Sequence, residues 1–376
     1  MKVFEPGRMG QLLVRNRLVR SATYEALATE NGRVTDKLVD LHKTLAKGGV
    51  GLIITGYTYV QEIGKGAPHM TGIDRDDLIP GLRRITEAVH TCGEGCKVAV
   101  QLTHCGRQTV LVENPPAPSA VFEPVVNRMP KEMSVGDIQE AVEAFAEAAR
   151  RAKEAGFDAV QLHGAHGYLL SGFLSPYTNR RTDEYGGNTK NRTRILKEIY
   201  FRIAEKTGND FPVLIKLNVS DFIEGGVDLN ESKKIAERLS RIGIAAIETS
   251  GGMFETRIHN RNLTASRTKI TSKDKEAYFL PYAREIKKVV DVPLILVGGI
   301  RSLDVIEQIL KEGSADFVAL SRPLIREPDL PNRWLRRIGG LTAQCISCNA
   351  CYKSLTNGGV RCVQKEEAEK KVWKES

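Results

Sequence analysis

The chain has 376 residues, 41% hydrophobic and 27% charged, a balance typical of a globular protein with room for one large barrel or two modest domains. No apolar run approaches membrane-spanning length, and the opening MKVFEPGRMG lacks the apolar core of a signal peptide, so we expect a cytoplasmic protein that binds no membrane. The formal net charge is +9, but basic and acidic residues are interspersed and no nucleic-acid motif occurs, which argues against binding of nucleic acid.

Eight short apolar or β-branched runs, each bounded by Gly, Pro or polar residues, predict eight β-strands. In chain order they are RLVRSAT (17–23), VGLIITG (50–56), KVAVQL (97–102), DAVQLHG (158–164), PVLIKLN (212–218), AAIETSGG (245–252), VPLILVGG (292–299) and DFVALSRP (316–323). Between most of them stand helical patterns, at 35–47, 78–91, 134–154, 188–206, 230–242, 281–290 and 302–311. Ser134 followed by Asp137 resembles a capping box at the start of the third.

Strict alternation of apolar strands with helices predicts a parallel sheet covered by helices, an α/β fold. Eight repeats favour a closed (β/α)8 TIM barrel over an open doubly wound sheet. A Rossmann sheet would need a GxGxxG turn after a strand, and the sequence contains none. Two connections are unusually long: 103–133, a proline-rich excursion after the third strand, and 253–280, a basic one. We expect both to cover the barrel mouth, the first as a β-excursion.

The most informative residues follow the fourth predicted strand. His163 ends this strand, and His166 and Tyr168 come three and five residues later. Reacting groups in such barrels lie at the C-terminal ends of strands, and two imidazoles and a phenol so spaced can converge on one oxygen atom of a ligand. A metal site built on His-x-x-His is less favoured because no third ligand follows at a suitable spacing. Purely structural histidines and a buried Tyr168 remain alternatives.

The segment QLHGAHGYLLSGFLSPYTNRRTDEYGG resembles the substrate-binding motif of the Old Yellow Enzyme family, which are flavin-dependent ene-reductases. The resemblance extends over residues 3–330 and implies FMN in the barrel mouth. NRLVRSAT and GVGLIITGYTYV are similar to the family's first two strands, and QLTHCGRQ, IKLN, LVGGIRS and ALSRP to later parts of its flavin site. These similarities imply a set of flavin-binding residues: Ala22, Thr23, Gly56, Tyr57, Gln101, Lys216, Gly298, Gly299, Arg301, Ser321 and Arg322.

The side-chain chemistry of this set agrees with that role. Gln101 offers the donor and the acceptor that the pyrimidine edge of a flavin requires, and Lys216 is a cation suited to a reduced, negatively charged ring. The glycine pair and Arg322 fit a phosphate site after the last two strands. Each has a structural alternative, since Gln101 can bind loop backbone, Lys216 can pair with Asp221 or Glu248, and Gly-Gly can simply turn the chain.

Three positions depart from the family pattern. The family commonly has Arg where Lys216 stands and Gly where Ser321 stands. The resemblance therefore defines the identity of the cofactor better than it defines the contacts of these two residues with the flavin ring and the phosphate. Tyr24 replaces the Cys or Thr that tunes flavin potential in many members, and we assign it no role.

Four of the seven cysteines are clustered near the C-terminus. CISCNACYKSLTNGGVRC places Cys345, Cys348, Cys351 and Cys362 in the pattern C-x2-C-x2-C-x10-C. Such spacing in a chain without a disulfide framework predicts an iron–sulfur or other metal site. The loop resembles the 4Fe-4S loop of the dienoyl-CoA reductase and trimethylamine dehydrogenase branch, with zinc or four free thiols as alternatives. We therefore expect an FMN-binding barrel, 1–335, and a cysteine-cluster extension, 336–376, packed on it.

Together these features predict an oxidoreductase that passes hydride from NADH or NADPH, through flavin N5, to the activated C=C of an α,β-unsaturated carbonyl compound. His163 and His166 bind the carbonyl oxygen, and Tyr168 protonates the α-carbon. Three alternatives stay open: an amine dehydrogenase, an FMN and iron–sulfur electron-transfer subunit of a complex, and a flavin-free sugar-phosphate barrel with Lys216 as Schiff base. We also expect a homo-oligomer and a separate electron-transfer protein as partner.

Overall fold

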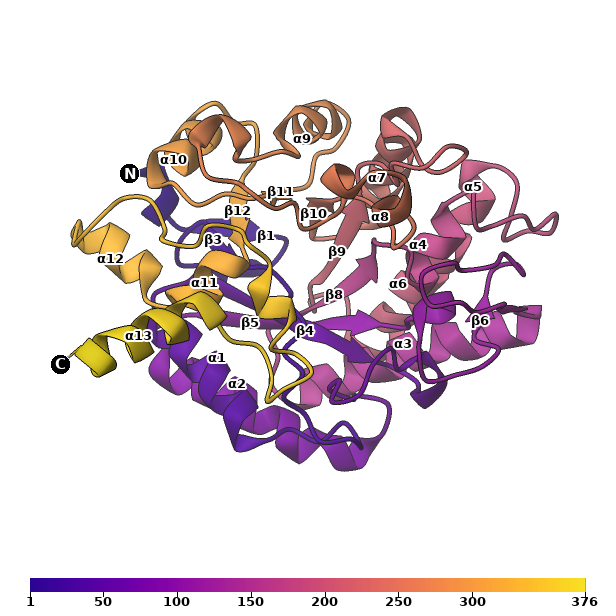
Figure 1. The fold of residues 1–376 in the computed structure, drawn as a ribbon. Helices are drawn as coiled ribbons and strands as arrows, with labels where there is room; N and C mark the ends of the chain where they lie inside the picture. The colour runs from indigo at the N-terminus through magenta and orange to yellow at the C-terminus, as the bar shows by residue number, and fades with distance from the viewer. Residues whose placement is uncertain (376) are drawn as a thin grey trace.

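A computed structural model of the chain describes residues 1–375, with side chains described as far as residue 371. Eight parallel strands close into a barrel with helices around it (Figure 1), which confirms the predicted TIM barrel. The strands follow one another around the barrel in chain order, and β12 pairs with β3 to close it. They are β3 (Leu18–Arg20), β4 (Leu52–Tyr59), β5 (Lys97–Thr103), β8 (Ala159–Gly164), β9 (Val213–Asn218), β10 (Ala246–Ser250), β11 (Leu294–Leu296) and β12 (Phe317–Leu320).

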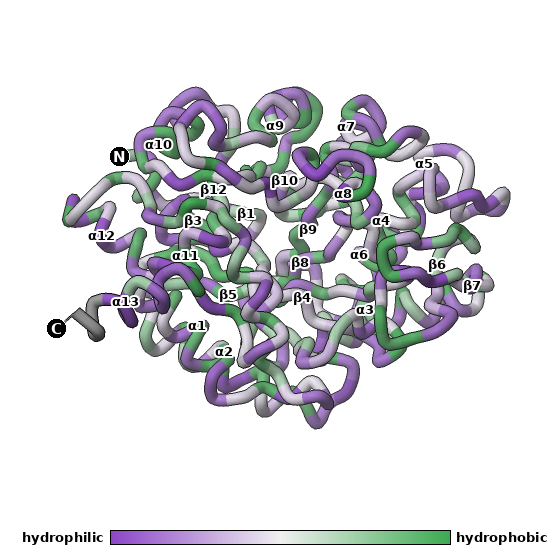
Figure 2. Tube along the Cα trace, in the orientation of Figure 1, coloured by the Kyte–Doolittle hydropathy of each residue, from purple (hydrophilic) through white to green (hydrophobic). Residues whose placement is uncertain are grey.

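All seven predicted helical regions form helices on the outside of the barrel: α1 (Asp36–Lys47), α2 (Ile79–Cys92), α3 (Val135–Glu154), α5 (Thr189–Arg192) with α6 (Arg194–Thr207), α7 (Leu229–Ile242), α9 (Leu280–Lys287) and α10 (Leu303–Lys311). In Figure 2 these helices show both hydrophilic and hydrophobic stretches, as amphipathic helices on a barrel should. The capping box of α3 is confirmed, because the Asp137 N–H donates to Ser134 Oγ at 3.1 Å and the Ser134 N–H donates to Asp137 Oδ2 at 2.8 Å.

The helix predicted over 188–206 is split in two at Thr193. The Thr193 hydroxyl donates to the carbonyls of Thr189 and Lys190, and α6 starts at the next residue. Short helices that the sequence analysis did not identify complete the fold: α4 (Leu169–Leu174), α8 (Thr256–His259), α11 (Arg322–Arg326), α12 (Leu330–Arg336) and α13 (Val363–Glu375).

A hairpin before the barrel closes its N-terminal end. Strands β1 (Gly7–Met9) and β2 (Leu12–Val14) pair antiparallel, and Met9, Leu12 and Val14 are buried in one cluster with the side chains that fill the barrel interior. A second, larger apolar layer lies between the strands and the helices. Because the interior is packed from below, ligands have access at the C-terminal ends of the strands.

The two long connections meet over that end. The first contains the predicted β-excursion, in which β6 (Pro116–Ala117) pairs with β7 (Lys131–Glu132). Arg107 Nη1 donates to Glu255 Oε1 at 2.5 Å, and both side chains are almost fully buried. This ion pair joins the first connection to the second.

The chain after α12 returns to the barrel and lies against it (Figure 1, yellow). The Ala343 N–H donates to the carbonyl of Arg301, and the Val360 N–H donates to the carbonyl of Glu25. The cysteine loop is therefore held near the barrel mouth. No helix in residues 1–375 combines the length and the apolar character needed to span a bilayer.

Candidate active site

A cavity of about 590 Å³ opens at the C-terminal ends of the strands. It brings together twelve of the residues selected from the sequence, although they come from positions as far apart as Ala22 and Cys351. These are Ala22, Thr23, Tyr57, Gln101, His163, His166, Tyr168, Lys216, Gly299, Ser321, Arg322 and Cys351. The barrel mouth is thus the one place where the predicted substrate, flavin and cysteine residues meet within the described structure.

Three predicted flavin-site residues lie outside the cavity wall. The Arg301 guanidinium donates to the carbonyls of Ile270 and Ala343, at 2.8 and 2.7 Å, so it fastens loops together. The Gly56 N–H donates to Glu25 Oε1 at 2.7 Å, and Gly298, with φ of +133°, turns the chain beside Tyr278. In each case the neighbouring residue in the sequence lines the cavity: Tyr57 beside Gly56, Gly299 beside Gly298 and Ile300 beside Arg301.

The two histidines and Tyr168 form a compact cluster. Ring centroids are 5.0 Å apart for His163 and His166, and 4.7 Å apart for His163 and Tyr168. His166 and Gly167 both have positive φ, +65° and +81°, so the chain leaves β8 in a strand-to-loop turn and the two histidines do not share a helix. Asn218 Oδ1 accepts from the His166 N–H and Gln108 donates to the His166 carbonyl, so this strained turn is held from two sides.

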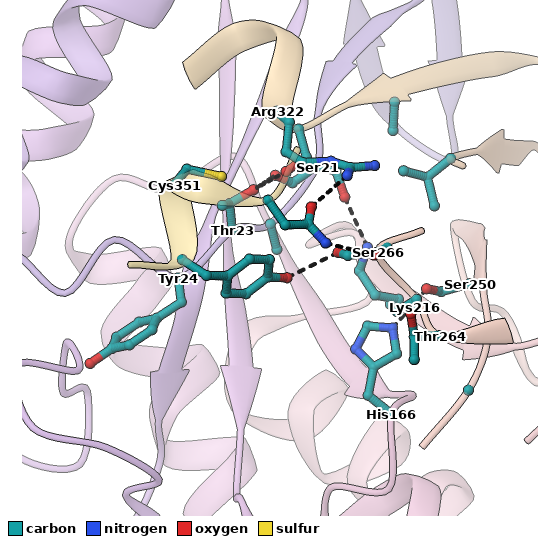
Figure 3. A pocket seen from close by; sticks show the side chains of 18 of the residues that line it. Ser21, Thr23, Tyr24, His166, Lys216, Ser250, Thr264, Ser266, Arg322 and Cys351 are labelled. Atoms are coloured by element: carbon teal, nitrogen blue, oxygen red, sulfur yellow. Dashed lines mark hydrogen bonds between the residues drawn. The ribbon is translucent and has the colours of Figure 1, made fainter. Parts of the chain in front are cut away.

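Ser250, which the sequence analysis missed, contacts His166 directly. Its Oγ lies 2.7 Å from His166 Nε2, and both side chains point into the cavity (Figure 3). His163 Nδ1, in contrast, is buried without a hydrogen-bond partner among the described residues. A buried nitrogen left without a partner is costly, so a polar ligand atom beside it would be stabilising.

Both imidazoles are neutral at physiological pH. Burial, with smaller effects from His166 and Lys216, holds the pKa of His163 well below its ordinary value. Burial and then Lys216 lower the pKa of His166 to about 3. Burial also raises the pKa of Tyr168 well above its usual range, so the phenol keeps its proton. The cluster therefore presents neutral N–H donors and a protonated phenol.

Lys216 is part of a buried polar network at the cavity floor. Its Nζ donates to Ser21 Oγ at 2.9 Å and forms an ion pair with Glu248 at 2.6 Å. Gln161 donates to the other oxygen of Glu248, and the Gln101 amide donates to Gln161 at 2.7 Å. Of the alternatives left open by the sequence, pairing with Glu248 is the arrangement in the structure. The carbonyl oxygen of the Gln101 side-chain amide accepts no hydrogen bond from the described residues and stays available as an acceptor.

An aromatic row lines one wall of the cavity. Tyr24, Tyr57, Tyr168 and Phe254 follow one another with ring centroids 5.1, 5.6 and 5.9 Å apart. Tyr24, left without a role by the sequence, thus belongs to the cavity wall. Flat apolar walls of this kind suit a planar ligand.

Another part of the cavity wall is cationic and polar. Arg322 Nη1 donates to Asn349 Oδ1 at 2.5 Å and to the Arg267 carbonyl at 2.8 Å, and Thr23 Oγ1 lies 2.8 Å from Ser321 Oγ. Residues from the second long connection and from the cysteine loop, including Ser266 and Tyr352, complete this wall. Sequence reasoning missed them because no local pattern indicates which loop residues fold back over a mouth.

The four clustered cysteines lie beside this wall without forming an assembled metal site. Burial raises the pKa of Cys345 and of Cys351. Neighbouring thiols also raise the pKa of each, while Arg322 lowers both. Arg326 Nη1 donates to Cys362 Sγ at 3.6 Å. Within the described residues, no three His, Cys, Asp or Glu side chains are close enough together to hold a metal ion.

The chain is similar in sequence and in fold to known oxidoreductases. Residues 2–338 match the family model described as NADH:flavin oxidoreductase / NADH oxidase. An NADH oxidase from Thermoanaerobacter brockii is 39% identical over 352 residues, which cover 92% of this chain and 52% of the relative. A 2-naphthoyl-CoA reductase complex has a TM-score of 0.88 at 27% identity, over 97% of this chain and 56% of that one. The old yellow enzyme homologue from Zymomonas mobilis has a TM-score of 0.76 at 28% identity, over 92% and 95%. The chain spans about half the length of the first two proteins.

Proposed function

The chain belongs to the NADH:flavin oxidoreductase / NADH oxidase family, as its resemblance to Old Yellow Enzymes predicted, and from this membership we propose that it is an ene-reductase. Its bound FMN would carry hydride from NADH or NADPH to the activated C=C of an α,β-unsaturated carbonyl compound. The observation that carries the proposal is the cluster of His163, His166 and Tyr168 in the wall of a cavity that also contains Gln101 and Lys216.

His163 and His166 hold the carbonyl oxygen of the substrate. As neutral imidazoles they each donate one N–H, and donors aimed at an oxygen that gains negative charge lower the reaction barrier. Ser250 fixes the ring of His166 and thereby selects which nitrogen faces the substrate. The contact between Ser250 and His166 therefore determines which ring nitrogen of His166 carries the proton.

Tyr168 delivers the proton that completes the reduction. Its raised pKa keeps the hydroxyl protonated, and its ring lies against His163, so the proton is available near the substrate carbon next to the carbonyl.

The FMN would lie along the cavity. The aromatic row suits the planar ring, Gln101 and Lys216 the pyrimidine edge, and Arg322 with the Ser321 region the phosphate. Ala22, Thr23, Tyr57 and Gly299 lie in the same wall, and we retain Gly56, Gly298 and Arg301 as supporting residues behind it.

For the extension 336–376 we propose a 4Fe-4S cluster on Cys345, Cys348, Cys351 and Cys362, with zinc as the alternative. Support comes from the spacing of the four cysteines, from Arg322, which acts against the effect of burial on the pKa of Cys345 and of Cys351, and from the contact between Arg326 and Cys362 Sγ. Such a cluster would supply one-electron transfer to or from a partner protein. The cysteine-cluster branch of the family stays a prediction.

The test is the visible spectrum of anaerobically purified protein, followed by NADH or NADPH and then a simple enone. We expect flavin bands that bleach with the nicotinamide and return with the enone. Bleaching that an enone does not reverse, with reoxidation by an added electron acceptor, would contradict ene-reduction and favour the electron-transfer alternative. Protein that releases no flavin on denaturation would contradict the cofactor as well.

A further inference from the structure

A second cavity, of about 330 Å³, lies on the outside of the barrel between α6 and α7, away from the mouth. Contacts to α7 lie at both ends of it. At one end Arg192 and Thr189 of α5 bind Glu231 of α7, and at the other the Tyr200 hydroxyl of α6 donates to the carbonyl of Gly243, the residue that caps α7, at 3.2 Å. The space between is therefore framed by fixed contacts, and its volume is within the range of small-molecule sites.

The groove is lined mainly by positively charged side chains. Five cations line it against one carboxylate, with Leu239 and Ile242 as apolar floor; the cations are Lys190, Arg194, Lys197, Arg238 and Arg241. The carboxylate, Glu198, already accepts hydrogen bonds from Gln139 at 3.1 Å and from the Tyr185 hydroxyl at 2.9 Å.

Only two of the five cations have an acidic partner in the described part of the chain. Arg194 lies 3.8 Å from Glu198, and Arg241 lies 2.5 Å from Glu237. Lys190, Lys197 and the half-buried Arg238 form no ion pair within residues 1–371. Lys190, Arg194 and Lys197 are spaced by four and three residues, and Arg238 and Arg241 by three, so like charges lie next to each other and repel.

We propose that the groove between α6 and α7 binds a phosphate-bearing small anion. Two guanidinium groups can bind phosphate oxygens in a bidentate manner, lysine ammonium groups add point charges, and the apolar floor accepts the organic part of the ligand. A bound dianion would relieve the repulsion between the cations. This inference does not depend on the flavin chemistry, because none of these residues lines the barrel mouth.

The test is calorimetric titration of the flavin-loaded full chain with inorganic pyrophosphate at low ionic strength, where screening is weak. We expect saturable binding that weakens by about tenfold or more in the double variant Lys197→Gln, Arg238→Gln, since each removes a phosphate contact. The matched control is Lys37→Gln, Lys43→Gln on α1, which changes the net charge equally and should bind as the unmodified chain does.

Three results would overturn the proposal: no binding to the unmodified chain, equal weakening in the α1 control, or equal binding in the groove variant. Binding of polyglutamate but not of pyrophosphate would also overturn it, because the groove would then accept an acidic peptide. Flavin content and enone reduction serve as a separate readout, and neither should change in the groove variant.

Discussion

Lys216 Nζ lies 2.6 Å from Glu248 Oε1 inside the barrel, and the two side chains are 4% and 0% exposed. Ser21 and Gln161 donate to the same carboxylate, so it is fully engaged. A lysine at the mouth would by itself favour a negatively charged, reduced flavin. Because Glu248 compensates the charge of Lys216, the ion pair determines how strongly the site favours the reduced flavin over the oxidised flavin.

Replacement of Glu248 by Gln should therefore raise the midpoint potential of the bound flavin. The amide has the shape of the carboxylate but only one acceptor oxygen for the donors of Ser21, Gln161 and Lys216, and it leaves Lys216 uncompensated. Each tenfold tightening of reduced over oxidised flavin shifts a two-electron potential by about 30 mV. Dye-equilibrated redox titration measures the shift. Asp221→Asn, at a buried carboxylate bound to Asn218, is the control. An unchanged potential in Glu248→Gln would show that the pair is only structural.

Tyr168→Phe should slow enone reduction by about 10²- to 10⁴-fold, the usual contribution of a general acid. Flavin reduction by the nicotinamide needs no such proton and should stay at its normal rate. Stopped-flow measurement separates the two half-reactions. Equal slowing of both would assign Tyr168 to ligand positioning.

The double variant His163→Ala, His166→Ala should lose binding of phenolic ligands and keep its flavin. Ser250→Ala should weaken phenol binding by only about fivefold, the effect of one neutral hydrogen bond. Titration of a phenol into the flavin-loaded protein, followed by the change in flavin absorbance, gives both values. Loss of flavin from the double variant would mean that the pair holds the cofactor instead.

The free energy of unfolding should fall as the pH drops below 6.5, in part through His163 and His166. Their folded-state pKa values are lowered, so in acid the unfolded chain binds protons that the folded chain does not. Each such histidine contributes about 1.4 kcal/mol per pH unit across that window. Glu25, with its pKa raised to about 7, acts in the opposite direction.

Urea unfolding of the apoprotein is measured between about pH 5 and pH 7 for the unmodified chain and for a variant, because only the difference between the two profiles isolates His163 and His166 from other buried groups such as Glu25 and His42. The variant His163→Asn, His166→Asn should show a shallower loss of stability than the unmodified chain. Parallel pH profiles for the two proteins would show that the imidazoles are not buried neutral groups.

Cys348→Ser should remove iron and sulfide from anaerobically purified protein and leave the flavin in place. Cys348 is the most exposed of the four thiols, so its replacement disturbs packing least. Cys92→Ser, outside the loop, is the control and should retain the metal. Zinc in place of iron in the unmodified chain would select the alternative, and the absence of both would leave four free thiols.

The sequence predicted the barrel well because its signals are local. Each of the eight strands is an apolar run, and several of the seven covering helical regions have a cap or a glycine stop, as at Ser134 and Gly243. The β1–β2 hairpin was missed because its six strand residues are too few for a periodic pattern. Thr193 divided a predicted helix through a hydroxyl–carbonyl contact that composition does not reveal.

The site was predictable where residues lie at strand ends, as with Gln101, His163 and Lys216. It was not predictable where loops fold back, as with Ser266 and Tyr352, or where partners come from distant strands, as with Ser250. Arg301 shows the reverse case. Its position after a strand suggested a ligand contact, but two loop carbonyls bind its guanidinium instead.

The buried ion pair of Arg107 and Glu255 has a consequence for attempts to alter substrate scope. Each residue belongs to a different loop over the mouth, and removing one partner leaves an uncompensated charge in a dry environment. A loop graft that removes Arg107 or Glu255 without its partner should therefore destabilise the protein, whatever its new contacts with substrate. Recombination with relatives must therefore keep this ion pair or exchange the two loops together.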